Sequence, residues 1–324
     1  MAENSKIEWC DHTFNPWEGC TKVSPGCANC YAEARNHRWG LDNWGKGKAR
    51  RKTSAANWKL PVKWNMQAEA FNLAQEYLEK SRARAPRVFC ASLADWLDDE
   101  VPIEWLADLL KLIHDTPNLD WLLLTKRPEN WVSRILKARN FFTKGGCADT
   151  ALWLNDWLPK AEMPGFPARD GKAPHNVWIG TTVENQEMAD KRIPELLKIP
   201  AKVRFLSCEP LLGALRIKDA LRCDVPIHWV ICGGESGPKA RPMHPDWARS
   251  LRDQCLAAQV PFFFKQWGEW AGSCYPEEGV IHVRKNGSSG DFPTEHSWSM
   301  KRVGKKAAGR LLDGREWNEF PKIN

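Results

Sequence analysis

The chain has 324 residues, of which 43% are hydrophobic and 27% charged, and its formal net charge is +7 at pH 7. This length suffices for one large α/β domain with a packed core. Because the sequence has no long apolar run and no apolar signal core, we expect a soluble intracellular protein. Eleven cysteines, an odd number, argue against a disulfide framework and favour reduced thiols in the cytoplasm.

The first predicted strand, Lys6–Cys10, leads into a loop that contains Pro, Gly and three cysteines, Cys20, Cys27 and Cys30. Thiolates select iron–sulfur clusters or zinc, and closed sites of either kind normally take four protein ligands. Three thiolates therefore indicate either a cluster with one iron open to an outside ligand or a structural zinc site with a fourth ligand from elsewhere. The residues that could complete the zinc site are Cys10, His12 and His37.

A basic loop follows, in which five cations lie within seven residues: Lys46, Lys48, Arg50, Arg51 and Lys52. Such a loop suits a phosphate backbone, and the nearby tryptophans could stack on bases. The alternative is a solvated loop beside tryptophans that pack in the core. A second cluster near the C terminus consists of Lys301, Arg302, Lys305, Lys306 and Arg310. DNA, RNA or a nucleotide is therefore an expected partner.

Farther along the chain, short apolar runs alternate with amphipathic helical patterns. The predicted strands are Arg87–Ser92, Trp121–Thr125, Val177–Thr181, Val203–Ser207, Trp229–Cys232 and Pro261–Phe264. The predicted helices are Ile103–His114, Pro128–Ala138, Asn185–Lys198 and His244–Ala258. Nearly continuous apolar strands are typical of a parallel sheet covered by helices. We therefore predict an α/β fold with a parallel sheet and outer helices, arranged as a barrel or as an open sheet.

Polar residues end each predicted strand, and they would gather at the carboxyl edge of the sheet, where α/β enzymes place their chemistry. The first strand would bring the cysteine loop to the same edge. Two segments interrupt the pattern, an insertion at about 140–174 and a Gly- and Lys-containing appendage at 269–324. We therefore predict a main domain over 1–268, with the appendage packed on or beside it.

Five motifs carry a resemblance to a known family: TFNPWEGCTKVSPGCANCYAE, VRFLSCEPLLG, WVICGGESGPKARPMHPDWARSLRDQC, VPFFFKQWGEW and, more weakly, LLDGREWNEFP. They closely resemble the phage-borne and prophage-borne three-cysteine-motif proteins, a radical-SAM-like family of unassigned reaction. The resemblance implies a partial or full (β/α) barrel of radical-SAM type that holds a [4Fe–4S] cluster and S-adenosylmethionine. It favours the cluster over zinc and implies a 5′-deoxyadenosyl radical that abstracts hydrogen from a carbon of the substrate.

Candidate site residues come from these motifs and from the strand ends. The expected cluster ligands are Cys20, Cys27 and Cys30. The expected contacts of the cofactor are Tyr31, Ser92, Asp95, Glu184, Gly233 and Gly234. The expected catalytic groups are Glu209, Glu235 and Lys265, with Glu209 favoured because it lies just past an apolar strand. For each carboxylate, the alternative is an ion pair at the sheet edge with Lys126, Arg127 or Arg204.

Two features depart from the usual radical-SAM pattern. Six residues separate Cys20 from Cys27, where three are standard, and Gly233-Gly234-Glu235 follows a late strand instead of the second one.

Two functions follow from the sequence. The first is a radical-SAM enzyme that modifies or repairs a nucleotide or a nucleic-acid base, with an electron donor such as flavodoxin or ferredoxin. The second is a non-catalytic nucleic-acid-binding protein with a structural zinc. Either would act in the cytoplasm without a membrane partner, and in the host cytoplasm if the protein is phage-encoded.

Overall fold

A computed structural model describes residues 3–81, 83–159, 171–273 and 278–322 of the chain. The chain divides into two compact units. Unit 1 comprises Met1–Thr21, Ala32–Gly180 and Lys198–Lys202, and unit 2 comprises Lys22–Tyr31, Thr181–Leu197 and Val203–Asn324.

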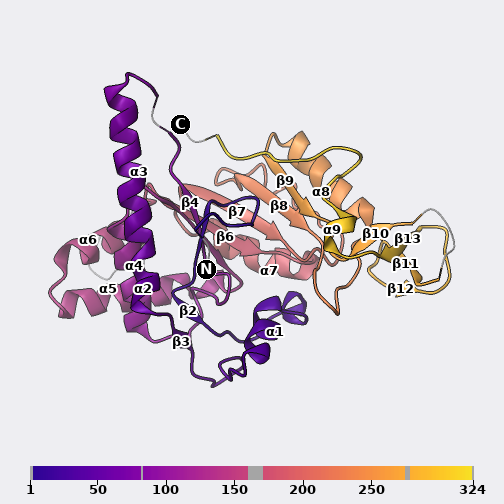
Figure 1. The fold of residues 1–324 in the computed structure, drawn as a ribbon, viewed down its shortest axis with the longest axis horizontal. Helices are drawn as coiled ribbons and strands as arrows, with labels where there is room; N and C mark the ends of the chain where they lie inside the picture. Colours follow the sequence, from indigo (N-terminus) through magenta and orange to yellow (C-terminus); the bar gives the residue numbers. More distant parts are fainter. Residues whose placement is uncertain (1–2, 82, 160–170, 274–277, 323–324) are drawn as a thin grey trace. The chain divides into compact units, whose positions relative to one another are not determined.

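Unit 1 contains the first strands and most of the long helices (Figure 1). Its elements are β1 (His12–Phe14), β2 (Trp17–Glu18), α1 (Tyr31–Arg38), β3 (Arg51–Lys52), α2 (Ala55–Trp58), α3 (Leu60–Tyr77), β4 (Arg87–Cys90), α4 (Ile103–His114), β5 (Asp120–Thr125), η2 (Pro128–Asn130), α5 (Trp131–Lys144), α6 (Ala148–Trp157) and the start of β6 (Val177–Thr182). The first residue of α1, Tyr31, belongs to unit 2. Helix α4 forms as predicted because its apolar residues recur on one stripe, and Leu106, Leu109, Leu110 and Ile113 are all fully buried.

Unit 2 contains the later strands of the main sheet and a small antiparallel sheet. Its elements are η1 (Pro25–Cys27), the end of β6, α7 (Gln186–Leu197), β7 (Val203–Cys208), β8 (Trp229–Gly233), α8 (Pro245–Ala257), β9 (Phe262–Gln266), β10 (Trp270–Gly272), β11 (Val280–Arg284), β12 (Ser289–Gly290), β13 (Ser297–Arg302) and α9 (Lys305–Ala308). The small sheet has the order β10-β13-β11-β12.

The main sheet has seven strands in the order β1-β4-β5-β6-β7-β8-β9, and its described pairings are parallel. Each strand therefore adds beside the previous one in chain order. With right-handed crossovers, this order keeps the connecting helices on one face of the sheet, as in a barrel, whereas a doubly wound sheet reverses direction at a switch point. The α/β prediction is confirmed, and the strand order is compatible with a partial β/α barrel.

The strands β4 to β9 are confirmed close to their predicted bounds, whereas the predicted first strand is wrong. Residues 6–10 form a turn in which the Cys10 amide donates to the Ile7 carbonyl over 3.2 Å. The strand begins only after Asp11, whose carboxylate accepts from the Arg87 amide over 2.7 Å and so aligns β1 with β4.

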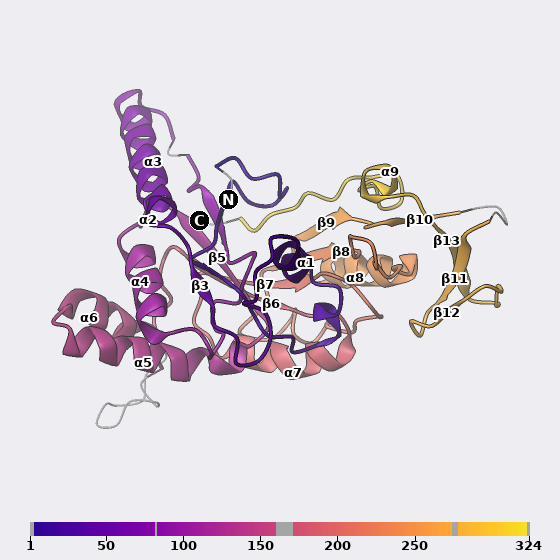
Figure 2. The same cartoon turned by 60° about the horizontal axis from the view of Figure 1, so that its bottom comes forward.

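The predicted insertion at 140–174 is helical in its first part. Helix α5 continues to Lys144, and α6 packs against α5 and α4, with the three helices side by side in both views (Figure 2). Leu154 and Trp157 of α6 are fully buried, so this segment belongs to the core of unit 1. Residues 160–170 of the predicted insertion lie outside the described residues.

The predicted appendage packs on the last strand of the main sheet, within unit 2. The Phe264 amide of β9 donates to the Trp317 carbonyl over 2.9 Å, and the Glu319 amide donates to the Phe262 carbonyl over 3.3 Å. Leu312 and Trp317 are buried. The tail thereby covers an edge strand whose backbone groups would otherwise be unpaired.

Within the described residues, every helix is too short or too polar to cross a lipid bilayer.

Candidate functional site

The three cysteines of the motif form no disulfide and are partly exposed. Cys20 follows β2 in unit 1, Cys27 ends the short helix η1 in unit 2, and Cys30 directly precedes α1. No group of three His, Cys, Asp or Glu side chains in the described part of the chain stands close enough to hold a metal ion. Their role as metal ligands stays a prediction from the sequence.

Arg127, two residues after the end of β5, lies against Cys20. Its Nη1 donates to Cys20 Sγ over 3.5 Å, and its Nη2 donates to the Thr21 carbonyl over 2.8 Å. Burial raises the pKa of the Cys20 thiol to about 12, although the guanidinium of Arg127 opposes this rise. In the metal-free chain Cys20 is therefore a neutral thiol with a cation beside it, which stabilises the thiolate once a metal replaces the proton.

Alkylation of the metal-free protein tests this state of Cys20. At pH 8 we expect Cys20 to react with iodoacetamide about 10²-fold or more slowly than a thiol of ordinary pKa, because so little of it is thiolate. The rate should rise about tenfold per pH unit above pH 8. Peptide mapping by mass spectrometry measures the rate, and labelling of Cys20 as fast as that of free cysteine would contradict the prediction.

Asp95, a predicted cofactor contact, holds together the ends of two strands in unit 1. Its Oδ1 accepts from Thr125 Oγ1 over 2.7 Å and its Oδ2 accepts from Arg127 Nη1 over 3.0 Å, while two backbone amides also donate to it. Ser92, the other candidate here, exchanges hydrogen bonds with the buried Asn15 side chain. Asp95 therefore positions Arg127, and its predicted contact with a cofactor stays untested.

In unit 2, Glu184 supports the cysteine loop from the end of β6. Its carboxylate is fully buried; Oε1 accepts from the Gly26 amide over 3.0 Å and Oε2 pairs with Arg192 Nη1 over 2.8 Å. A Cβ at position 26 would lie only 3.0 Å from this carboxylate, so a glycine there permits the close approach. Glu184 thus fixes the residue immediately before Cys27.

Glu235, at the end of β8, holds the same loop on the other side of Cys27. Its Oε2 accepts from Asn29 Nδ2 over 3.1 Å, and Arg241 binds both of its oxygens and donates to the Pro25 carbonyl over 3.0 Å. Burial raises the pKa of Glu235, but the hydrogen bonds from Arg241 and Asn29 outweigh it and leave the pKa below its ordinary value. Two of the predicted site carboxylates therefore position the loop of Cys27 and Cys30.

Glu209, Gly233 and Lys265 lie together at the ends of β7, β8 and β9 in unit 2. Glu209 Oε2 accepts from Lys265 Nζ over 3.0 Å. A Cβ at Gly233 would stand 2.7 Å from Glu209 Oε1. The structure thus brings together three predicted site residues that are far apart in sequence.

The remaining candidates have other surroundings. Gly234 packs against the backbone just past β9, where a Cβ at its position would meet the Trp267 carbonyl oxygen at 1.9 Å. Tyr31 begins α1 and is 60% exposed. Each of the candidate carboxylates has a basic partner: Arg127 for Asp95, Arg192 for Glu184, Arg241 for Glu235 and Lys265 for Glu209.

The basic loop is largely neutralised within unit 1. Arg50 is buried and pairs with Asp98 and Glu100. Arg51 pairs with the buried Glu18, while Lys48 and Lys52 pair with the exposed carboxylates of Asp42 and Asp108. Four of the five cations therefore have carboxylate partners, which weakens the expectation of a phosphate-binding loop.

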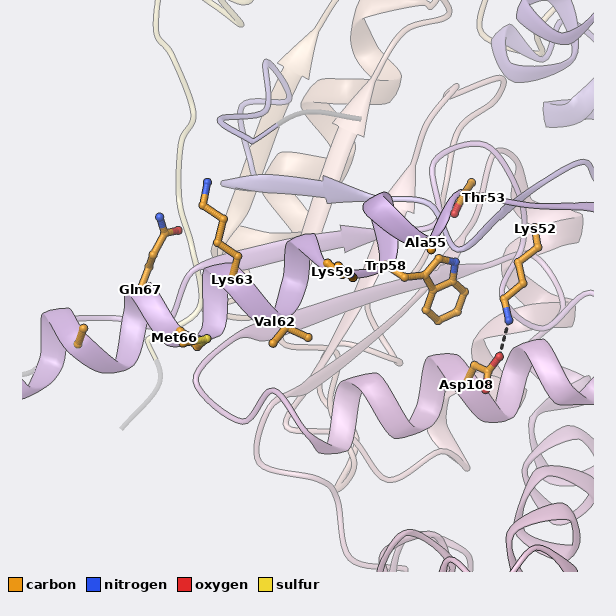
Figure 3. Close-up of a pocket in the computed structure, with 11 residues that line it drawn as sticks. Lys52, Thr53, Ala55, Trp58, Lys59, Val62, Lys63, Met66, Gln67 and Asp108 are labelled. Atoms are coloured by element: carbon orange, nitrogen blue, oxygen red, sulfur yellow. Dashed lines mark hydrogen bonds and ion pairs between the residues drawn. The ribbon is translucent and has the colours of Figure 1, made fainter.

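An open groove of about 1010 Å³ lies along α2 and α3 in unit 1. Figure 3 shows Trp58, Val62 and Met66 along it, with the ion pair of Lys52 and Asp108 at one end. None of the predicted site residues lines this groove, so its chemistry is separate from that of the strand ends.

Arg192 and Arg241 were not selected from the sequence as site residues, and Arg127 was considered only as an ion-pair partner. A signal existed for two of them: Arg127 lies two residues after a predicted strand, and Arg241 stands six residues after Glu235 in the GGESGPKAR motif. Arg192 lies inside a helical pattern that gives no sign of its partner.

The fold and these strand ends define an α/β protein whose parallel strands follow one another in chain order and carry buried carboxylates at their carboxyl ends. The chain belongs to the DUF5131 family, described as proteins of unknown function, which matches residues 4–321. No curated protein and no solved structure matches it.

Proposed function

We propose that this protein is a radical S-adenosylmethionine-type enzyme that holds a [4Fe–4S] cluster through Cys20, Cys27 and Cys30. One observation carries the proposal: two buried carboxylates at strand ends, Glu184 and Glu235, fix the backbone and side chains around Cys27. Two carboxylates that fix one short loop are explained if the loop has to present thiolates in a set geometry. The resemblance to the phage-borne three-cysteine-motif proteins supports the same function.

The chemistry of the three donors suits such a cluster. The three thiols are free of disulfides and partly exposed, and Arg127 places a cation 3.5 Å from the sulfur of Cys20. Soft thiolates select iron–sulfur clusters, and a set of three leaves one iron open. The chemistry that the bound cluster and S-adenosylmethionine supply is reductive cleavage of the cofactor to a 5′-deoxyadenosyl radical.

The protein's own residues have positioning roles in this proposal. Arg127 stabilises the Cys20 thiolate, and Glu184 and Glu235 hold the loop that carries Cys27 and Cys30. Glu209 and Lys265, at neighbouring strand ends, orient the substrate. Such fixed groups exclude water and competing hydrogen donors from the reacting carbon.

The substrate class that we propose is a nucleotide or a base of DNA or RNA, to be modified or repaired. The net charge of +7 favours an anionic partner. The electron donor would be a small redox protein such as flavodoxin or ferredoxin, and the reaction would take place in the cytoplasm, or in the host cytoplasm if the protein is phage-encoded.

Anaerobic purification followed by metal and sulfide analysis tests the proposal. We expect about four iron and four sulfide per chain, and an EPR spectrum of the dithionite-reduced protein that shifts when S-adenosylmethionine is added. One zinc per chain, with no iron after attempted reconstitution, would contradict the proposal and favour the nucleic-acid-binding protein with a structural zinc.

A further inference from the structure

The carboxylate of Glu209 has one oxygen with a partner and one without. Oε2 accepts from Lys265 Nζ over 3.0 Å, whereas Oε1 is buried and receives no hydrogen bond from the described residues. A buried acceptor left unpaired destabilises the fold, and more so when it is charged. Such atoms are rare in folded proteins and call for a partner.

The Glu209 carboxylate occupies space that is open because residue 233 is a glycine. In the sheet, β8 lies between β7, which precedes Glu209, and β9, which carries Lys265. The Glu209 side chain therefore passes over the end of β8 to reach Lys265. A Cβ at position 233 would stand 2.7 Å from Oε1 and 3.3 Å from the carboxyl carbon. Only a glycine at this position therefore leaves room for the Glu209 carboxylate.

The backbone after Glu209 is fixed on both sides. The Leu211 amide donates to the Gly233 carbonyl over 2.9 Å, and the Leu212 amide donates to the Glu184 carbonyl over 2.7 Å. The carboxylate therefore projects from a rigid segment, and Oε1 keeps its position beside Gly233 without a partner of its own.

The charges around Oε1 decide which kind of group it accepts from. Lys265 already balances the charge of Glu209, and the two side chains are only 20% and 14% exposed. The neighbouring thiols of Cys208 and Cys232 are fully buried, and burial raises the pKa of both, so they stay neutral. A cationic ligand would leave an unbalanced charge in this place, and an anion would face the carboxylate oxygen directly. An uncharged N–H donor fits best.

We propose that Glu209 Oε1 accepts a hydrogen bond from the exocyclic amino group of a nucleobase, either cytosine N4 or adenine N6. A carboxylate is a known acceptor for the cytosine amino group. The preference for an uncharged N–H donor rests on the contacts described here, whereas the identity of that donor as a nucleobase rests on the proposed function. Uracil and hypoxanthine carry a carbonyl oxygen in place of the amino group. That oxygen is itself an acceptor, so it would be repelled by Oε1 and could not donate to it.

Equilibrium dialysis of the full-length protein, with and without its cluster, tests this subsite with two matched pairs: CMP against UMP, and AMP against IMP. In at least one pair we expect the amino-bearing nucleotide to bind about tenfold or more tightly. Glu209→Gln, whose amide can present either an oxygen or an NH2 group, should bring that ratio close to one. Gly233→Ala should do the same by displacing the carboxylate.

A matched control is Glu187→Gln, which removes an exposed carboxylate from the first turn of α7 and should keep the parent ratio. Thermal unfolding checks that each variant folds, and the parent protein gives the primary answer without any variant. Equal affinities within both pairs, or no binding of any of the four nucleotides, would overturn the subsite and assign Oε1 to a buried water. Iron and sulfide contents are independent of this result, so failure of the subsite is distinguishable from failure of the proposed function.

Discussion

Replacing Cys27 with alanine is expected to lower the iron and sulfide bound per chain from about four of each to less than about one. The proposed cluster has only three protein ligands, so two remaining thiolates would not retain it. Four other described thiols of unit 2 lie outside the motif. Cys208, Cys232 and Cys255 are fully buried, and burial raises the pKa of each thiol above its ordinary value. Cys223 is partly exposed and donates to the Ala220 and Val225 carbonyls.

The control for this variant is Cys147→Ala. Cys147 is a partly exposed cysteine of unit 1, just before α6, and it lies outside the motif. Its replacement should leave the iron content at the parent level. The circular dichroism spectra of both variants should match that of the parent protein, which shows that both fold. Iron retained in Cys27→Ala at the parent level would refute the ligand assignment.

Replacing Arg50 with methionine is expected to lower the free energy of unfolding by about 3–5 kcal/mol. The Arg50 side chain has no exposed area; it pairs with Asp98 over 2.8 Å and Glu100 over 3.1 Å, and it donates to Thr21 Oγ1 over 2.8 Å. Asp98 is as deeply buried as Arg50, so the variant leaves an uncompensated carboxylate in the core of unit 1. Urea unfolding followed by circular dichroism measures the change.

Lys48→Met is the matched control, since it removes a cation two residues away in the same loop. Lys48 and its partner Asp42 are 47% and 76% exposed, so their ion pair should contribute less than about 1 kcal/mol. Similar losses in the two variants would contradict the buried role of Arg50. A large effect of Arg50→Met alone means that this part of the basic loop stabilises the fold and is not available for phosphates.

Much of the fold was predictable because its signals are local in sequence. The later strands of the main sheet are buried apolar runs; VRFLSC forms β7 and WVICG forms β8, close to the predicted bounds. Helix α4 matches its prediction at both ends because leucine recurs with the period of a helix.

Where local signals are weak, the prediction failed. Strand β1 has three residues, too few for a period to show, and its place depends on pairing with β4. Helix α3 was missed because much of its surface is exposed, with apolar residues such as Met66 and Phe71 facing solvent.

The sequence by itself determined the order of strands and helices, the presence of a three-cysteine loop and the concentration of polar residues at strand ends. Only the tertiary structure decided which of those residues meet. Glu184 binds Gly26 across 158 residues of sequence, and Glu209 reaches Lys265 across 56 residues. The physical reason is that side-chain periodicity specifies strands and helices over a few residues, whereas hydrogen bonds and ion pairs between strand ends depend on the through-space packing of the sheet.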